Sequence, residues 1–186
     1  MFMNYRSYSK LASLPLWLLL MESCYANDYI DVEISGIKLA DEKSYSKALK
    51  LLNMQTSKKT NSLEKICNQS LSEVARFSFF EGASYGQVMQ IDVAKVDKSE
   101  CKGDKVGSVK LERLTTNNGI SLGQKYGVVV SKLRIKENLN SRVINVKVVH
   151  SKSKFLREKN MPEYVAKYIF SDDGTLTSFS FGFAYP

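Results

Sequence analysis

The fold is decided by the C-terminal stretch YVAKYIFSDDGTLTSFSFGFAY, residues 164–185. Its two ends, residues 164–170 and 175–185, are rich in aromatic and β-branched residues, which favour strands. Asp172, Asp173 and Gly174 lie between them and predict a tight turn, because glycine readily adopts positive φ. The stretch therefore predicts a β-hairpin near the end of the chain.

Four further stretches have a strand-like composition, and turn residues bound them: residues 73–80, 85–96, 106–114 and 142–149. Two other stretches place apolar residues at i, i+3, i+4 and i+7, the spacing of the buried side of an amphipathic helix. These residues are Tyr45, Ala48, Leu49 and Leu52 in the first, and Tyr126, Val129, Val130 and Leu133 in the second. We expect a short helix at each place.

A short motif precedes each predicted helix. Gly36-Ile37-Lys38-Leu39 is echoed 83 residues later by Gly119-Ile120-Ser121-Leu122. Together with the strands that follow, this echo predicts an α+β fold. It consists of two tandem repeats, each a short helix followed by about three antiparallel strands. The first repeat spans residues 27–118 and the second spans residues 119–186.

Two tandem units of this kind resemble the β-lactamase-inhibitor-protein fold. The Gly-Ile-x-Leu segments and the aromatic hairpin are similar to the SmpA/OmlA-type outer-membrane assembly lipoproteins; the hairpin residues are Tyr164, Tyr168, Phe170, Gly174 and Phe179. The resemblance covers most of residues 36–185 and implies a non-catalytic protein-binding module. Those lipoproteins carry a lipobox, which Glu22 disrupts in this sequence, and no functional residue is carried over from them.

The N-terminus has the layout of a secretory signal peptide. Arg6 and Lys10 precede an apolar run, residues 11–21, which is shorter than the roughly 20 residues of a membrane-spanning helix. Small residues follow at Cys24 and Ala26. We expect removal of residues 1–26 and export to the periplasm or the medium. Lipid attachment at Cys24 and an uncleaved anchor are the alternatives, and the intact mass of the exported protein distinguishes all three.

Removing residues 1–26 leaves two cysteines, Cys67 and Cys101. An even number of cysteines in an exported protein indicates a disulfide bond. The residues around them form no Cys-x-x-Cys redox motif. We therefore predict one structural disulfide.

The formal net charge of +8 is concentrated in the second repeat. Residues 125–159 contain ten basic residues and only two acidic ones, Glu137 and Glu158. The basic residues that we expect to contact a partner are Lys125, Lys132, Lys136, Lys152, Lys154 and Arg157. Residues 150–159 are Ser- and Lys-rich and are expected to form a mobile loop. Such a segment favours a protein with an acidic surface or an anionic envelope lipid; a solvated face is the alternative, and no nucleic-acid-binding motif is present.

The aromatic residues within each of the last two strands are separated by an even number of positions, so they share a strand face. Two short helices are not expected to cover every aromatic face of six strands. Exposed aromatic side chains often anchor protein interfaces. The aromatic residues that we expect to contact a partner are Tyr164, Tyr168, Phe170, Phe179 and Phe181.

Residues 119–123, Gly-Ile-Ser-Leu-Gly, match the G-x-S-x-G pattern of serine hydrolases. That chemistry also needs a buried strand before Ser121, which the polar residues 115–118 do not provide, and an acid and a histidine after it. His150 is the only histidine in the chain, and a metal site lacks donors. We expect no catalytic residues, no metal site and no cofactor. The sequence thus predicts an exported protein-binding module of the inhibitor, immunity or envelope-assembly type. The alternatives are a small periplasmic serine hydrolase that uses Ser121 and a carrier of apolar ligands.

Overall fold

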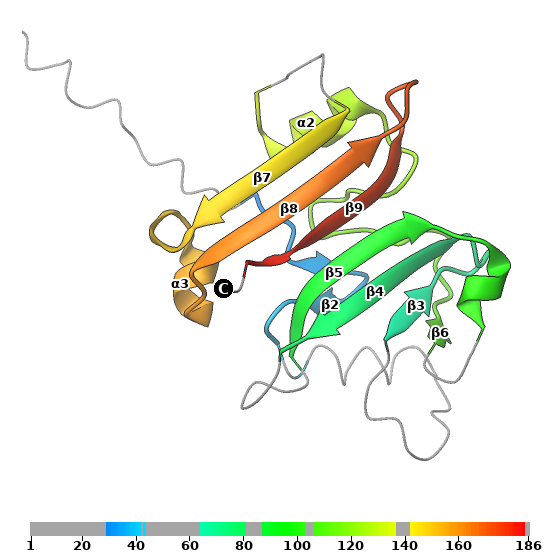
Figure 1. The fold of residues 1–186 in the computed structure, drawn as a ribbon, viewed down its shortest axis with the longest axis horizontal. Coiled ribbons are helices and arrows are strands. Elements are labelled where there is room, and N and C mark those ends of the chain that lie inside the picture. The colour runs from blue at the N-terminus through cyan, green and yellow to red at the C-terminus, as the bar shows by residue number, and fades with distance from the viewer. Residues whose placement is uncertain are drawn as a thin grey trace, which may run out of the picture.

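Strands dominate the structure, a computed structural model that describes residues 29–41, 43, 64–80, 87–102, 106–136 and 142–184. Seven strands form one sheet in the order β6-β3-β4-β5-β9-β8-β7 (Figure 1). Their bounds are β3 Lys65–Cys67, β4 Glu73–Phe79, β5 Val88–Lys95, β6 Val106–Ser108, β7 Val143–Val149, β8 Glu163–Phe170 and β9 Leu176–Phe183. All neighbouring strands in this sheet are antiparallel except β3 and β6. The predicted α+β class is confirmed.

Two sets of consecutive antiparallel strands meet at the centre of the sheet. The strands β3, β4 and β5 form one set and β7, β8 and β9 the other, and the last strand of each set pairs with the last strand of the other, from Gln90 opposite Gly182 to Ala94 opposite Ser178. The first predicted helix, at residues 45–52, lies outside the described residues. The complete repeat of a helix followed by three strands is therefore not confirmed.

The predicted helix in the second half is present as α2, Tyr126–Leu133. Val129, Val130 and Leu133 are its buried residues, as the apolar spacing requires. The helix ends where Arg134 adopts a left-handed conformation with φ of 50°. Burial of this apolar stripe outweighs the modest helix propensity of three consecutive valines.

Residues 150–159 do not form the loop that we expected from the sequence. They contain a 3₁₀ turn, η3, at His150–Lys152 and a short helix, α3, at Lys154–Lys159. The hydroxyl of Ser153 caps α3 by accepting a hydrogen bond from the backbone N–H of Leu156, and the Leu156 side chain is fully buried. One apolar anchor and one cap are enough to order this Lys-rich segment.

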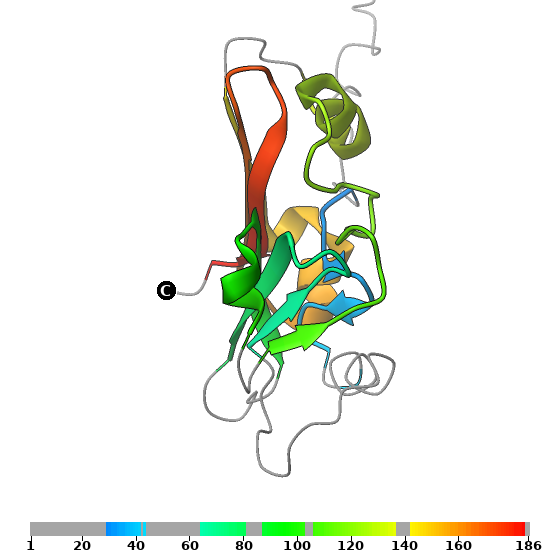
Figure 2. The same cartoon turned by 90° about the vertical axis from the view of Figure 1, so that its right-hand side faces the viewer.

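One face of the sheet carries the hydrophobic core. The helices α2 and α3 and the small hairpin of β1, Glu33–Ile34, and β2, Ile37–Lys38, all lie on the same side of the sheet (Figure 2). Irregular segments add much of the cover, and their buried side chains include Ile30, Leu39, Leu114, Ile120 and Leu122. The core therefore draws on long connecting segments as well as on helices.

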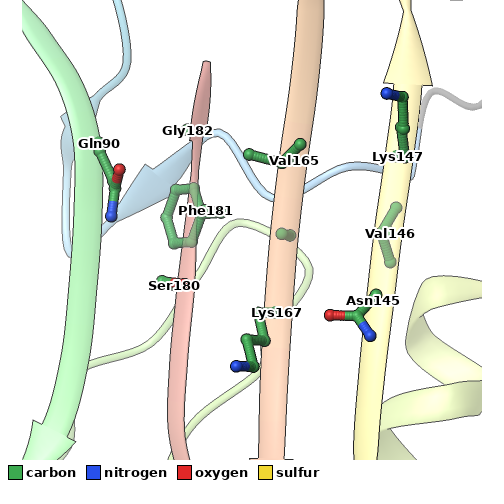
Figure 3. A pocket seen from close by; sticks show the side chains of 10 residues that line it. Gln90, Asn145, Val146, Lys147, Val165, Lys167, Ser180, Phe181 and Gly182 are labelled. Atoms are coloured by element: carbon green, nitrogen blue, oxygen red, sulfur yellow. The ribbon is translucent and has the colours of Figure 1, made fainter. Parts of the chain in front are cut away.

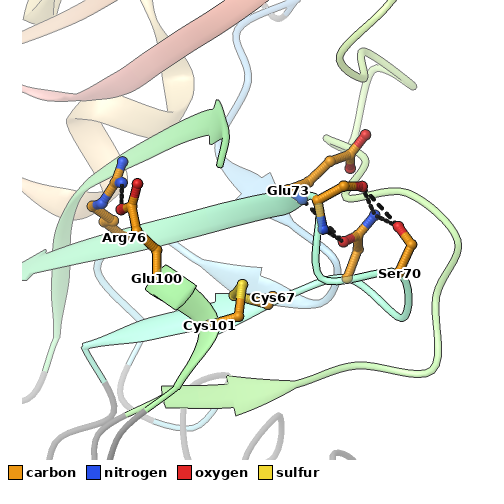
Figure 4. The surroundings of a disulfide bond; sticks show 8 residues. Cys67, Ser70, Glu73, Arg76, Glu100 and Cys101 are labelled. Carbon is orange, nitrogen blue, oxygen red and sulfur yellow. Dashed lines mark hydrogen bonds and ion pairs between the residues drawn. A yellow bond between two sulfur atoms is a disulfide. The ribbon is translucent and has the colours of Figure 1, made fainter. Parts of the chain in front are cut away.

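The predicted disulfide between Cys67 and Cys101 is confirmed. It joins β3 to the 3₁₀ turn η2, Lys98–Cys101 (Figure 4). Cys67 lies opposite Val74, and Val74 is fully buried although it belongs to the face away from the main core. Arg76 and Glu100 form an ion pair between β4 and η2. The bridge and η2 thus cover one end of the sheet face that points away from the main core.

None of the helices in the described part of the chain is both long and apolar enough to span a membrane.

Candidate binding groove on the open face of the sheet

The central strand β9 presents different side chains to the two faces of the sheet. Residues on one strand alternate between faces, so the side chains of Phe179, Phe181 and Phe183 point into the core. Ser178, Ser180 and Gly182 belong to the opposite face, which neither α2 nor α3 covers (Figure 2). Small side chains along a central strand lower the surface there, which creates a groove.

The groove spans strands β5, β9, β8 and β7 (Figure 3). It is open to solvent and is not an enclosed cavity. Its lining residues are Gln90, Asn145, Val146, Lys147, Val165, Ala166, Lys167, Ser180, Phe181 and Gly182. On the open face these residues form two rows across the strands. Gln90, Gly182, Val165 and Lys147 lie opposite one another in the first row, and Ser180, Lys167 and Asn145 do so in the second.

Gly182 is required at its position by the close approach of β5. A Cβ atom added to Gly182 would lie 2.5 Å from the carbonyl oxygen of Met89 and 2.8 Å from Cα of Gln90. Both are backbone atoms and cannot move aside as a flexible side chain could. Any larger residue would push β5 and β9 apart and change the floor of the groove.

Polar and cationic groups line both walls. Gln90 and Asp92 of β5 are hydrogen-bonded to each other, with 3.0 Å between Nε2 of Gln90 and Oδ1 of Asp92. On β7, Lys147 pairs with Glu163 at 2.7 Å. Lys167 of β8 lies opposite Ser180 on one side and Asn145 on the other, and it has no ion-pair partner among the described residues. The groove therefore offers one cation without an ion-pair partner, together with hydroxyl and amide groups and, across Ser180 from Lys167, the carboxylate of Asp92.

The aromatic residues expected to contact a partner lie on the other face, in the core. Tyr164, Tyr168, Phe170, Phe179 and Phe181 are each at most 4% exposed. The prediction of an exposed aromatic sheet face is therefore wrong. Only helices were considered as cover at the sequence level, whereas the N-terminal segment and the segment before α2 cover these rings as well.

The two buried tyrosines hold the N-terminal segment on the sheet. The hydroxyl of Tyr164 donates to the backbone oxygen of Asp31 at 2.8 Å, and the hydroxyl of Tyr168 donates to Oδ2 of Asp31 at 2.6 Å. Burial raises the pKa of Asp31, and hydrogen bonds from Thr116, Tyr168 and Asn118 offset part of this rise. The site is structural, because Asp31 is fully buried.

The basic residues expected to contact a partner do not form one surface. Lys125 lies at the start of α2, where it pairs with Asp173 at 3.0 Å, and Lys132 donates to the backbone oxygen of Gly119. Exposed Lys136 follows α2. The remaining three, Lys152, Lys154 and Arg157, belong to η3 and α3. Strand β7 separates the two groups, which lie at its opposite ends (Figure 1).

Ser121 and His150 also lie at opposite ends of the sheet. The loop of Ser121 is tied to the start of β9 by the hydrogen bond from Gly123 N to Leu176 O, whereas His150 N donates to Pro162 O just before β8. The eight residues of β8 lie between these ends, about 25 Å at 3.3 Å per residue. Ser121 is buried, so the arrangement of a serine hydrolase is not formed by this pair. Within the described ranges, no group of three or more His, Cys, Asp or Glu side chains is placed to hold a metal ion.

No protein-family model matches the chain, and no curated protein or solved structure matches it either. Any function must therefore be inferred from the geometry of the chain itself.

Sequence reasoning missed the groove and its three defining residues, Lys167, Ser180 and Gly182. The signal was present in residues 178–183, SFSFGF, where phenylalanine alternates with small residues. An alternation of this kind places the aromatic rings on one face and a low strip on the other. The prediction from the sequence used only the aromatic residues of this alternation and not the small residues between them.

Proposed function

We propose that the protein is an exported, non-catalytic protein-binding module that holds an extended acidic segment of a partner protein in the groove across β5, β9, β8 and β7. The observation that carries this proposal is the low strip of Ser180 and Gly182 beside Lys167, which has no ion-pair partner among the described residues. A cation beside a groove of small polar residues suits a carboxylate-bearing chain better than an apolar ligand.

The dimensions of the groove fit a peptide segment. Across the strands the lining reaches from Gln90 of β5 to Lys147 of β7, three strand spacings or about 14 Å, the length of four extended residues, and along β9 it covers Ser180 to Gly182. Strands β5 and β8 lie one strand spacing to either side of β9, so the walls are about 10 Å apart. Val165 is 37% exposed and provides an apolar contact beside Lys167. A partner segment that alternates apolar and acidic side chains would match both.

The charge distribution supports an acidic partner. The chain carries a formal net charge of +8, and the basic groups near α2 and α3 surround the sheet at two ends. Such a field speeds the approach of an acidic protein without contacting it directly. In this proposal Lys167 makes the contact, and the two basic groups act over a longer range.

The disulfide supports the exported location, because such bonds persist in oxidising compartments. Two related units remain part of the proposal, in keeping with the resemblance to the β-lactamase-inhibitor fold. Support comes from two backbone hydrogen bonds, Ala40 N to Val88 O and Gly123 N to Leu176 O, both at 2.9 Å. Ala40 and Gly123 are 83 positions apart, and each donates to the first residue of a central strand.

Site-specific photo-crosslinking in the producing cells tests the proposal. A photoreactive amino acid replaces Ser180 in the groove or, as a control, the exposed residue Val128 on α2. We expect a discrete protein adduct from position 180 and none from position 128. Equal adducts from both positions, or none from position 180, would contradict the proposal.

A further inference from the structure

Strand β7 is the last strand of the sheet, and no described strand pairs with its outer edge (Figure 1). At its two ends, Arg142 O accepts from Phe170 N and His150 N donates to Pro162 O. Backbone groups alternate in direction along a strand, so the even-numbered residues of β7 bond to β8. The backbone N–H and C=O groups of Asn145 and Lys147 therefore point outward.

The sequence of this edge is complementary to itself. Residues 143–149 read Val-Ile-Asn-Val-Lys-Val-Val. When a second copy runs antiparallel with the two Val146 residues opposite each other, Ile144 lies opposite Val148 of the second copy. Asn145 then lies opposite Lys147 of the second copy. Apolar residues meet apolar residues, and the one cation meets an amide.

The backbone pattern selects the same alignment. Asn145 and Lys147 hold the outward-pointing groups, and they become the hydrogen-bonded pairs on either side of the central Val146 pair. Shifting the second copy by two residues also keeps this pattern, but one such shift places the two Lys147 side chains opposite each other. Like charges directly opposite across strands are destabilising. The alignment centred on Val146 avoids this repulsion and gives Asn145 and Lys147 of both copies a partner within residues 145–147.

The edge has few of the features that usually prevent strand pairing. Residues 143–149 contain no proline and only one charged residue, and the pairing of β7 with β8 has no register shift. An edge that offers outward backbone groups and a regular register can accept another strand.

We propose that two copies of the chain pair antiparallel through β7 about a two-fold axis at Val146, which forms a continuous sheet across the dimer. Paired residues share a face of an antiparallel sheet, so the two open faces lie on the same side. This places two grooves side by side. The pairing itself involves only β7 and does not require the partner protein proposed above.

The test is the dimer dissociation constant of the purified mature protein, measured by sedimentation velocity over a wide concentration range. Asn145→Glu places a carboxylate opposite Lys147 of the second copy, and Asn145→Lys places two cations opposite each other. Each change occurs twice in the dimer. We expect tighter and weaker association respectively, each by about 2- to 30-fold. Val128→Glu and Val128→Lys change the charge equally on α2 and should leave association unchanged.

Disulfide formation between two copies provides a second test that does not depend on small changes in the dimer dissociation constant. Val146→Cys should form an intermolecular disulfide rapidly in dilute oxidant, because the residues at position 146 of the two copies lie opposite each other across the two-fold axis. Lys147→Cys faces Asn145 of the second copy and should form it much more slowly. A wild-type chain that stays monomeric up to millimolar concentration would overturn the proposal, as would a dimer that responds equally to the changes at positions 145 and 128. Neither result bears on the groove.

Discussion

The hydroxyl of Tyr168 donates a 2.6 Å hydrogen bond to Oδ2 of Asp31, 137 positions away in the sequence. This contact joins the N-terminal segment to β8. Asp31→Ala leaves a buried tyrosine hydroxyl without its acceptor, so we expect a loss of about 1–3 kcal/mol in the free energy of unfolding. Asp31→Asn retains an acceptor oxygen and should cost less. Urea denaturation at pH 7 measures both, and equal losses would contradict this role of the hydrogen bond.

Asp31 should also make stability depend on pH. Burial raises its pKa above the ordinary value of 3.8, so between that value and the raised pKa the folded protein binds more protons than the unfolded chain. The free energy of unfolding therefore falls as pH rises through this interval. Burial likewise raises the pKa of Glu73 above 4.5. Urea denaturation from pH 4 to pH 8 should show a shallower fall for Asp31→Asn than for the wild type; an unchanged slope would exclude Asp31 as a contributor.

The disulfide should contribute substantially to stability. Cys67 and Cys101 are 34 positions apart, and closing a loop of that length is worth about 4 kcal/mol on the chain-entropy estimate. We expect the urea midpoint to fall when reductant is added. The double variant Cys67→Ala/Cys101→Ala is the control, because its midpoint should be low and insensitive to reductant. A wild-type midpoint that does not move would show that the bond is thermodynamically silent.

Gly182→Ala should destabilise the centre of the sheet. The added Cβ would lie 2.5 Å from the Met89 carbonyl oxygen, and relieving this overlap requires a backbone shift between β5 and β9. Overpacking of this kind costs about 1–3 kcal/mol. Ser180→Ala, two residues earlier on the same face, is the matched control and should change stability by less than about 0.5 kcal/mol. Equal thermal denaturation midpoints for the two variants would argue against the close approach.

Much of the sheet was predictable because its strands are long enough for period-two patterning. The stretch 142–149 anticipated β7, and 164–170 with 175–185 anticipated the β8–β9 hairpin, where Gly174 has φ of 73° as the turn requires. Strand β3, Lys65–Cys67, was missed because three residues are too few to show a period.

The candidate binding surface was harder to predict than the strands. Period-two spacing shows which residues share a face, but it does not say which face is covered. Tyr164 and Phe181 were assigned to an exposed face because the irregular segments that carry Ile30, Leu114 and Leu122 have no periodic signal. Those segments cover the aromatic face of the sheet, so the groove lies on the opposite face.

The most direct test of the groove compares two charge reversals with the same change in net charge. Lys167→Glu alters the groove, whereas Lys154→Glu alters the exposed start of α3. The readout is the yield of the photo-crosslinked protein adduct from position 180 in the producing cells, with each variant at equal abundance. Binding in the groove predicts at least a tenfold loss of adduct for Lys167→Glu and little change for Lys154→Glu. Equal yields from the two variants would contradict it.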